Sequence, residues 1–277
     1  MEIIKPFLVQ LLNNAAESDN VIYRRNLLKD YIQVVILSFI YSHPKYSQMV
    51  FYGGSCLRHC FDLPRLSEDL DFVDLKKDIK LADLAVDLEK YFKKDTDLEV
   101  KIKVQPSRVQ IKFAILKEMG LAGPSESDDL YLKLEVFKYF DFCSGYEINI
   151  MPIFKFNRSM LIKTFDLPTM MATKIGAVMN RRWNKTAKGG EVLAKVKGRD
   201  YFDLFWYLQK AIKPNLNCLT DKESKDSLKE KLLAVIAKVD KKSIEYDLGP
   251  LMESSDFVNG LAKNIKDILT REIQEKL

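Results

Sequence analysis

The sequence predicts an α/β half followed by an all-helical half, with the change near residue 165. In the first half, polar and apolar residues alternate over short segments, which is typical of half-buried strands. From Asp166 onward, apolar residues recur instead at helical spacing. We therefore expect an α+β domain with a mixed or antiparallel sheet at residues 1–165 and a helical bundle at residues 166–277.

The composition is that of a globular protein in the cytoplasm. The chain has 277 residues, of which 47% are hydrophobic and 30% charged. No apolar run approaches the roughly 20 residues needed to span a bilayer, and the N-terminus lacks the features of a secretory signal. The formal net charge of +5 permits a polyanionic partner without requiring one.

The elements follow in order along the chain. Residues 3–18 and 22–42 have helical spacing, and His43-Pro44 ends the second helix. The sequence leaves open whether the N-terminal helices, residues 1–45, pack on the helical domain. An apolar run at residues 49–52 predicts a buried strand, and Ser55 is suited to be the N-cap of a short helix that ends near Asp62.

The remaining elements are predicted by the same patterns. A strand at residues 69–73 and an amphipathic helix at 80–93 come first. Further strands are expected at 98–104, 109–116, 130–137 and 146–153, with a polar loop at 120–129. Further helices are expected at 168–183, 200–212, 222–239 and 256–276.

The four cysteines are Cys56, Cys60, Cys143 and Cys218. Cys56 and Cys60 would share a helix face and could form half of a zinc site, but the sequence has no second ligand pair. The pattern therefore favours small buried thiols in a reducing compartment.

A Gly-Gly-Ser turn follows the first predicted strand, at Gly53, Gly54 and Ser55. Glycine lets the backbone approach a ligand closely and adopt positive φ. A helix that begins directly after the turn points backbone N–H groups at the ligand, and Ser55 adds a hydroxyl. The turn suits a triphosphate, although most turns of this kind only connect two elements.

Two carboxylates in D-x-D spacing, Asp69 and Asp71, project from one face of the next predicted strand. Adjacent carboxylates repel unless a hard cation such as Mg²⁺ or Mn²⁺ neutralises them, and a solvated strand face is the alternative. Metal-dependent nucleotidyl transfer usually uses a third carboxylate from a neighbouring strand. Glu135 is the best choice and Asp141 a weaker one, although Glu135 is explained nearly as well as a solvent-facing strand residue.

These motifs resemble a known family. The pattern G-G-x-x-L-R followed by R-x-S-x-D-x-D-F resembles the AbiEii-type nucleotidyltransferases of the DNA polymerase β superfamily, the toxins of bacterial toxin–antitoxin and abortive phage-defence systems. The matching residues are Gly53, Gly54, Ser55, Leu57, Arg58, Arg65, Ser67, Asp69, Asp71 and Phe72. Two later motifs of the family, K-x-x-A-x-x-x-R and R-D-x-x-D-L, match Lys174, Ala177, Arg181, Arg199, Asp200, Asp203 and Leu204. One departure is a longer gap between Arg181 and Arg199.

The resemblance implies a role for each motif residue. The nucleotide would be bound by Gly53, Gly54, Ser55, Arg58, Arg65, Ser67, Lys174 and Asp203. Asp69 and Asp71 would be catalytic metal ligands, and Glu135 is the third ligand that the strand pattern offers. Lys174 would hold a phosphate, which suits a compact point charge. Asp200 or Asp203 would complete the site from the helical half, and Asp200 is favoured; alternatively, Asp200 could be an N-cap and Asp203 could pair with Arg181.

The resemblance implies Mg²⁺-dependent transfer of a nucleoside monophosphate from an NTP to a hydroxyl, with the 3′ end of tRNA as the expected acceptor. A cognate antitoxin is a possible protein partner, and no membrane is expected. Basic residues gather between Lys174 and Arg199, where a solvated face or an RNA-backbone contact would explain them. The alternatives are a small-molecule or protein acceptor, or a nucleotide- or RNA-binding protein without activity.

Overall fold

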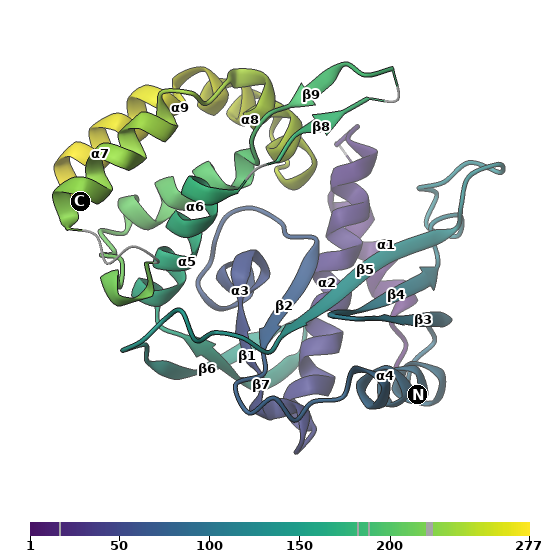
Figure 1. Ribbon diagram of the computed structural model, residues 1–277. Coiled ribbons are helices and arrows are strands. Elements are labelled where there is room, and N and C mark those ends of the chain that lie inside the picture. Colours follow the sequence, from purple (N-terminus) through teal and green to yellow (C-terminus); the bar gives the residue numbers. More distant parts are fainter. Residues whose placement is uncertain (17, 182, 188, 220–223) are drawn as a thin grey trace. The chain divides into compact units, whose positions relative to one another are not determined.

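The computed structural model describes residues 1–277 except 17, 182, 188 and 220–223 (Figure 1). The chain forms two compact units. The first comprises residues 1–140 and 148–164, and the second comprises residues 141–147 and 165–277. The N-terminal helices belong to the first unit. The assignment of residues 1–165 and 166–277 to separate domains stays a prediction.

The first unit is built on a seven-stranded mixed sheet, which confirms the predicted α+β class. Its helices are α1 (Lys5–Asn14), α2 (Val21–Ser42), α3 (Gly53–Cys60) and α4 (Leu81–Asp95). Its strands are β1 (Val50–Tyr52), β2 (Asp69–Val73), β3 (Val100–Gln105), β4 (Arg108–Ala114), β5 (Asp129–Phe137), β6 (Ile148–Lys155) and β7 (Arg158–Phe165). The strand order is β3-β4-β5-β2-β1-β7-β6, in which β2 is parallel to β5 and β1 to β7.

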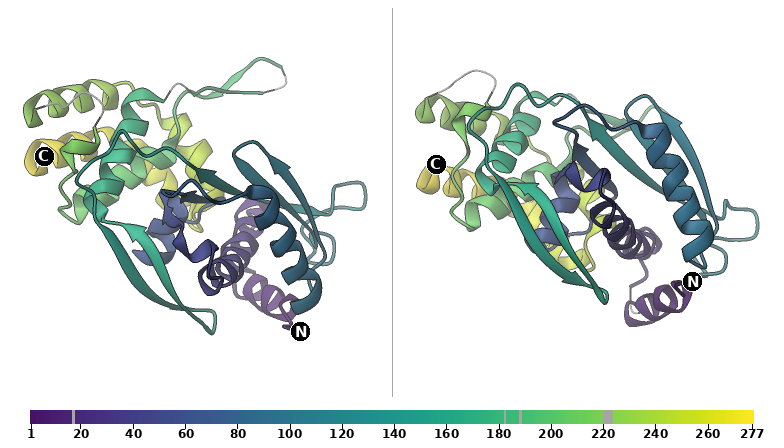
Figure 2. Two further views of the ribbon diagram at one scale, coloured as in Figure 1. Left: turned by 60° about the horizontal axis from the view of Figure 1, so that its bottom comes forward. Right: turned by 90° about the horizontal axis from the view of Figure 1, so that it is seen from below.

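One face of the central strands is apolar and buried, because the side chains alternate between the two faces. Leu70 and Phe72 of β2 lie in register with Leu134 and Val136 of β5, and all four are buried. Helix α4 packs along β3 and β4 (Figure 2). Every residue of α2 from Asp30 to Leu37 is buried, so this stretch of the helix is covered on all sides. The opposite sheet face keeps the polar residues.

The second unit is mainly helical. It contains α5 (Leu167–Asn180), α6 (Gly198–Gln209), α7 (Lys225–Ile236), α8 (Lys241–Leu248) and α9 (Ser255–Lys276), with a small hairpin of β8 (Lys185–Thr186) and β9 (Val192–Ala194). Side-chain oxygens cap the backbone N–H groups at the starts of four helices. These N-caps are Asp166, Ser224, Asp240 and Ser254.

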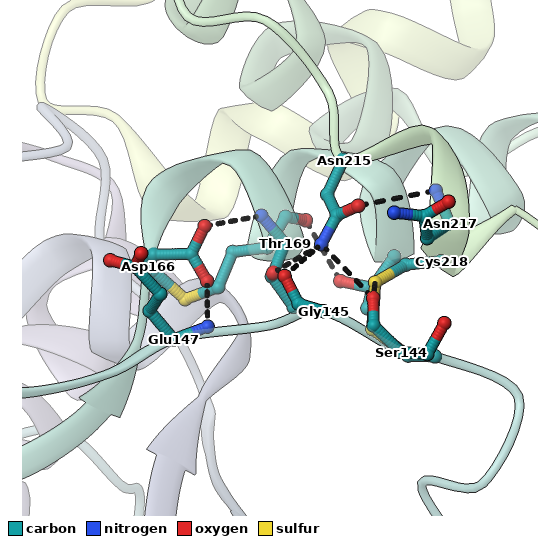
Figure 3. Close-up of a disulfide and its surroundings, with 11 residues drawn as sticks. Ser144, Gly145, Glu147, Asp166, Thr169, Asn215, Asn217 and Cys218 are labelled. Atoms are coloured by element: carbon teal, nitrogen blue, oxygen red, sulfur yellow. Dashed lines mark hydrogen bonds between the residues drawn. A yellow bond between two sulfur atoms is a disulfide. The ribbon is translucent and has the colours of Figure 1, made fainter.

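The loop at residues 141–147 is bonded to the rest of the second unit by a disulfide and hydrogen bonds (Figure 3). Cys143 forms a disulfide with Cys218, and the side-chain amide of Asn215 donates to the carbonyl of Gly145 at 3.1 Å. The Asp166 carboxylate accepts the backbone N–H of Glu147 at 3.0 Å. The disulfide between Cys143 and Cys218 was not predicted, because the sequence spacing does not reveal the approach of the two residues. Cys56 and Cys60 are buried thiols as expected.

Several elements differ from the predictions. The predicted strand at 146–153 is observed two residues later, as β6, and the hairpin partner β7 is absent from the prediction. Phe156 and Asn157 form the β6–β7 turn at positive φ without a glycine, so the turn lacks its usual sequence signal. The β8–β9 hairpin and α8 were also not predicted, and the expected helix start at 222 lies outside the described residues.

Helix α3 begins at Gly53, two residues before its predicted N-cap. Tyr52 occupies the N-cap position without a side-chain cap. Ser55 is buried, and its hydroxyl donates to the backbone carbonyl of Asp69 instead of capping the helix. The hydroxyl therefore ties α3 to the first residue of β2.

Candidate functional site

The polar face of the sheet brings together carboxylates from two strands. Asp69 and Asp71 of β2 lie in register with Lys133 and Glu135 of β5. Residues in register on neighbouring strands project to the same face, so the three carboxylates share that face. Tyr52 of β1 lies opposite Asp71 on its other side. The expected neighbourhood of Asp69, Asp71 and Glu135 therefore results from the parallel pairing of β2 and β5.

Asp69 and Glu135 each lie beside a positively charged side chain. An Asp69 oxygen is 3.7 Å from the Lys133 Nζ, and a Glu135 oxygen is 3.2 Å from the Arg108 Nη1. Among the residues that the structure describes, no group of three or more His, Cys, Asp or Glu side chains is arranged to hold a metal ion. Asp141, the alternative third carboxylate, lies in the loop at 141–147.

The two glycines at the start of α3 allow close packing against the motif residues that follow. Gly53 has φ of +78°, and a Cβ placed there would lie 2.5 Å from an Asp71 carboxylate oxygen. A Cβ on Gly54 would lie 2.7 Å from the Arg65 guanidinium and 3.0 Å from the Ser67 hydroxyl. No larger side chain fits at either position without movement of these groups, so the two parts of the first motif are sterically matched.

Arg65, Ser67 and Arg58 have different degrees of access to solvent. Arg65 and Ser67 are buried, and the Arg65 Nη1 donates to the carbonyl of Leu66 at 2.8 Å. Arg58 is half-buried, and its Nε donates to the Asp30 carboxylate of α2 at 3.2 Å. Arg65 therefore packs against the turn from the protein interior, whereas part of Arg58 reaches the surface.

A buried polar network behind α3 was not foreseen. Gln33 of α2 donates from Nε2 to the Ser67 carbonyl at 2.9 Å, and its Oε1 accepts from the His59 Nε2 at 2.9 Å. The His59 Nδ1 lies 3.1 Å from the Lys155 Nζ. The available signal was the occurrence of Asp30 and Gln33 beside and within the apolar run of α2 that begins at Tyr31. The network joins α2, α3 and the segment that carries Ser67.

Burial controls the charges in this network. It lowers the pKa of His59 to about 3, so the imidazole is neutral and can accept from Lys155 through Nδ1. For Asp30, burial opposes ionisation, but the nearby His59 ring and the charges of Lys155 and Arg58 outweigh it and lower the pKa. Asp30 is therefore an ionised carboxylate between the cations of Arg58 and Lys155.

In the second unit, the downstream motifs form a buried cluster of ion pairs. The Lys174 Nζ lies 2.7 Å from an Asp200 oxygen and 2.8 Å from an Asp203 oxygen. Arg181 binds the other Asp200 oxygen at 2.9 Å. Burial opposes the charge of Asp200, but Lys174 and Arg181 outweigh it and lower the pKa of Asp200.

This cluster resolves the alternatives for the two aspartates. The N-cap of α6 is Lys197, so Asp200 is not the cap but lies in the first turn of the helix. Asp203 pairs with Lys174, whereas Arg181 pairs with Asp200. Both aspartates thus converge on the same lysine, as one turn of helix allows for residues three apart.

The first residues of the R-D-x-x-D-L segment fix α6 against α8. A Cβ on Gly198 would lie 2.8 Å from the Cα of Ile244, so only glycine permits this approach. Arg199 forms a two-pronged ion pair with Asp247, with contacts of 3.1 Å from Nε and Nη2. These contacts fix the first turn of α6, which carries Asp200, and Asp203 lies three residues further along the helix.

The basic segment between Lys174 and Arg199 divides into paired and exposed residues. Lys185 is exposed on β8, and the Lys197 Nζ lies 5.9 Å from the centre of the Trp183 ring. Burial, then the nearby Arg199 and Arg181, lower the pKa of Lys197. Arg182 and Lys188, also expected in this segment, lie outside the described residues.

Comparison with solved structures shows that the fold is shared with a nucleotidyltransferase toxin. MenT4, a nucleotidyltransferase toxin from Mycobacterium tuberculosis, is similar in structure with a TM-score of 0.55 and 12% identity, over 95% of this chain and 89% of that one. JHP933 from Helicobacter pylori is similar with a TM-score of 0.47 and 19% identity, over 90% of this chain and 94% of that one. No curated protein sequence matches.

None of the described helices is both long and apolar enough to cross a bilayer. The model of a single protein family, described as nucleotidyl transferase AbiEii toxin of a type IV toxin–antitoxin system, matches residues 37–273. That range contains both the glycine–carboxylate motif of the first unit and the lysine–aspartate cluster of the second. The chain therefore belongs to the AbiEii family of nucleotidyltransferase toxins.

Proposed function

We propose that this toxin transfers a nucleoside monophosphate from an NTP to a hydroxyl at the 3′ end of tRNA, with release of pyrophosphate. The observation that carries the proposal is the contact between the Gly53–Gly54 turn and the carboxylate face of β2, where Gly53 leaves room only for the Asp71 carboxylate. The turn provides the backbone N–H groups that bind a triphosphate, and the carboxylates provide the oxygens that bind a metal ion.

The donor set fits Mg²⁺ or Mn²⁺. Asp69, Asp71 and Glu135 present carboxylate oxygens, which hard divalent cations prefer, on one face of the sheet. When bound there, the cation would offset the charge of the triphosphate and polarise its phosphorus–oxygen bonds. The half-buried position of the three residues leaves their oxygens accessible to a ligand.

The nucleotide would be held at the start of α3. Gly53 and Gly54 form the first turn of α3, and their backbone N–H groups would be the helix donors for the phosphates. Arg65 and Ser67 lie against Gly54 and would shape the turn, while Arg58 offers a half-exposed guanidinium. In this proposal Ser55 acts through the Asp69 carbonyl that its hydroxyl binds.

Lys174, Asp200 and Asp203 have a separate proposed role. The two aspartates hold the Lys174 ammonium in one position, where a compact positive charge suits phosphate binding. Asp200 is the favoured catalytic partner, because Arg181 also holds its carboxylate. The family match and the resemblance of these motifs support the assignment.

The acceptor is proposed to be RNA because basic residues gather between Lys174 and Arg199. Lys185 and Lys195 lie on or beside the β8–β9 hairpin, and lysine side chains contribute salt-dependent affinity for a phosphate backbone. Modified tRNA would no longer support translation, which suits a toxin. A cognate antitoxin would be the protein partner.

The test is to incubate the purified protein with Mg²⁺, each labelled NTP in turn and total RNA. Label should enter the tRNA band for at least one nucleotide, and EDTA should abolish it. Prior periodate oxidation of the RNA 3′ ends should also abolish it, because the attacking hydroxyls are destroyed. Label in a protein or small-molecule fraction would instead identify a different acceptor, and transfer of no nucleotide would contradict the proposal.

A further inference from the structure

A cavity lies at the end of β5, close to the sheet face that carries Asp69, Asp71 and Glu135. Its volume is about 620 Å³, and it lies between the β3–β4 turn and the start of α4. All of its lining residues belong to the first unit. Buried Ile79 and Val136 contribute apolar surface to its lining, and Phe137 and Tyr139 contribute aromatic rings. Cavities lined by apolar side chains with a few polar groups are typical ligand sites.

Strand register places this cavity next to the carboxylates. Phe137 follows Glu135 by two residues on β5, so its Cα is about 7 Å from that of Glu135 and it projects to the same face. The Phe137 ring contacts the ring of Tyr52 with a centroid distance of 5.9 Å, and Tyr52 lies opposite Asp71. Phe137 thus lines the cavity and borders the carboxylates.

The rings of the cavity are accessible. Tyr139 is 77% exposed and Phe137 is 37% exposed, although aromatic rings are usually covered. Exposed aromatic rings beside basic groups are the means by which proteins stack the bases of single-stranded nucleic acids. An apolar ligand alone would not explain the charges that surround these rings.

Those charges are mostly positive. Lys80 and Lys138 line the cavity, and the Lys77 Nζ lies 4.9 Å from the centre of the Tyr139 ring. Of the two acidic residues in the segment 74–80, Asp74 is buried and accepts the backbone N–H of Ile79, which leaves Asp78 at the surface. The cavity therefore combines stacking surfaces with cations suited to phosphates.

A base bound in this cavity could belong either to the NTP or to the RNA acceptor, and the lysines distinguish the two. In the proposed function the phosphates of the NTP lie at Gly53 and Gly54, so its base would bring no phosphate for the lysines of the cavity. A polynucleotide brings a phosphate with every base. The geometry points to a docking site for the unpaired 3′-terminal bases of the RNA acceptor, in the cavity of Phe137 and Tyr139; this inference rests on the proposed nucleotidyl transfer to RNA.

The experiment compares Tyr139→Ala with Phe154→Ala. Phe154 is also 77% exposed and lies on β6, at the opposite edge of the same sheet, so it is a matched control for the loss of an exposed ring. Binding of a fluorescently labelled single-stranded RNA oligonucleotide is measured by anisotropy, with duplex RNA of the same sequence alongside. The KM values for RNA and for NTP are measured in the transfer reaction.

Tyr139→Ala should weaken binding of the single strand about 5- to 150-fold, the range expected for one lost stacking contact. It should raise the KM for RNA while leaving the KM for NTP unchanged, and Phe154→Ala should match the wild type in both assays. Lys138→Ala should weaken binding and reduce its salt dependence.

Unchanged binding by Tyr139→Ala, or equal losses in Tyr139→Ala and Phe154→Ala, would overturn the inference. A raised KM for NTP with unchanged RNA binding would assign the ring to the base of the NTP and overturn the acceptor site. The anisotropy measurement does not depend on catalysis. If the wild type binds the strand through Tyr139 but transfers no nucleotide, the proposed function fails and the RNA site stands.

Discussion

At the scale of single residues, the glycine turn and the carboxylates constrain each other. Gly53 has a left-handed backbone, which glycine adopts without cost, and its missing side chain leaves the space that Asp71 occupies. Gly120 also has positive φ, but no atom lies within 4 Å of the position that its Cβ would take. A substitution at Gly120 therefore tests backbone strain alone, whereas a substitution at Gly53 tests strain together with displacement of the Asp71 carboxylate.

Gly53→Ala and Gly120→Ala should each lose about 1–2 kcal/mol from the free energy of unfolding because of the strained backbone. Only Gly53→Ala should also lose nucleotide transfer, since its methyl group displaces the Asp71 carboxylate. Urea denaturation and initial transfer rates measure the two effects. Equal transfer rates in both variants would show that Asp71 does not depend on Gly53.

Asp200 provides a prediction of pH dependence. Its pKa is lowered in the folded protein, so its ionised form stabilises the fold above the unfolded pKa of about 3.9, and this contribution is lost as the pH falls below that value. Asp200→Asn should therefore be less stable than the wild type at pH 7 by about 1–3 kcal/mol, because charge-assisted bonds to Lys174 and Arg181 are weakened.

The difference between Asp200→Asn and the wild type should shrink as the pH falls below about 4. Asp267→Asn, which changes an exposed residue on α9, is the control and should differ little from the wild type at either pH. Urea denaturation at pH 7 and pH 3 makes the comparison. A difference that grows toward low pH would show that Asp200 is not stabilised in its ionised form.

At the scale of elements, α6 and α8 approach each other as closely as their backbones allow. Gly198→Ala should cost about 1–3 kcal/mol of unfolding free energy, because a methyl group would meet the backbone of Ile244 at 2.8 Å. Gly260→Ala, within α9, has nothing within 4 Å and should instead stabilise the helix by about 1 kcal/mol. Thermal unfolding distinguishes them, and a neutral Gly198→Ala would contradict this packing.

The elements also show how far sequence patterns reach. The alternation in residues 130–137 predicted β5 closely, because a half-buried strand imposes a period of two. The β6–β7 turn was missed because Phe156 and Asn157 adopt positive φ without glycine. Helix α8 was missed because its apolar positions are few, and its packing on α6 and α9 gives it stability that local spacing does not show.

At the scale of the whole molecule, the separate motifs could be found in the sequence but their pairing could not. The D-x-D spacing placed Asp69 and Asp71 on one strand face. Which strand brings Glu135 beside Asp71 depends on the order and register of the sheet, and these are set by long-range packing. The contacts of Lys174 with Asp200 and Asp203 likewise depend on how α5 packs on α6.

The central claim is that Asp69 and Asp71 carry metal-dependent nucleotidyl transfer. Asp129 is a matched control, since it is also a half-buried strand carboxylate with a lysine partner, Lys112, at 3.2 Å. The decisive measurement is the rate of label transfer from NTP to RNA by Asp69→Asn, Asp71→Asn and Asp129→Asn at several Mg²⁺ concentrations.

The first two variants should lose more than about 100-fold in rate, because even the outer partners of metal ligands cost 10- to 100-fold. Asp129→Asn should transfer at the wild-type rate. Full activity in Asp71→Asn, or equal losses in all three variants, would contradict the account.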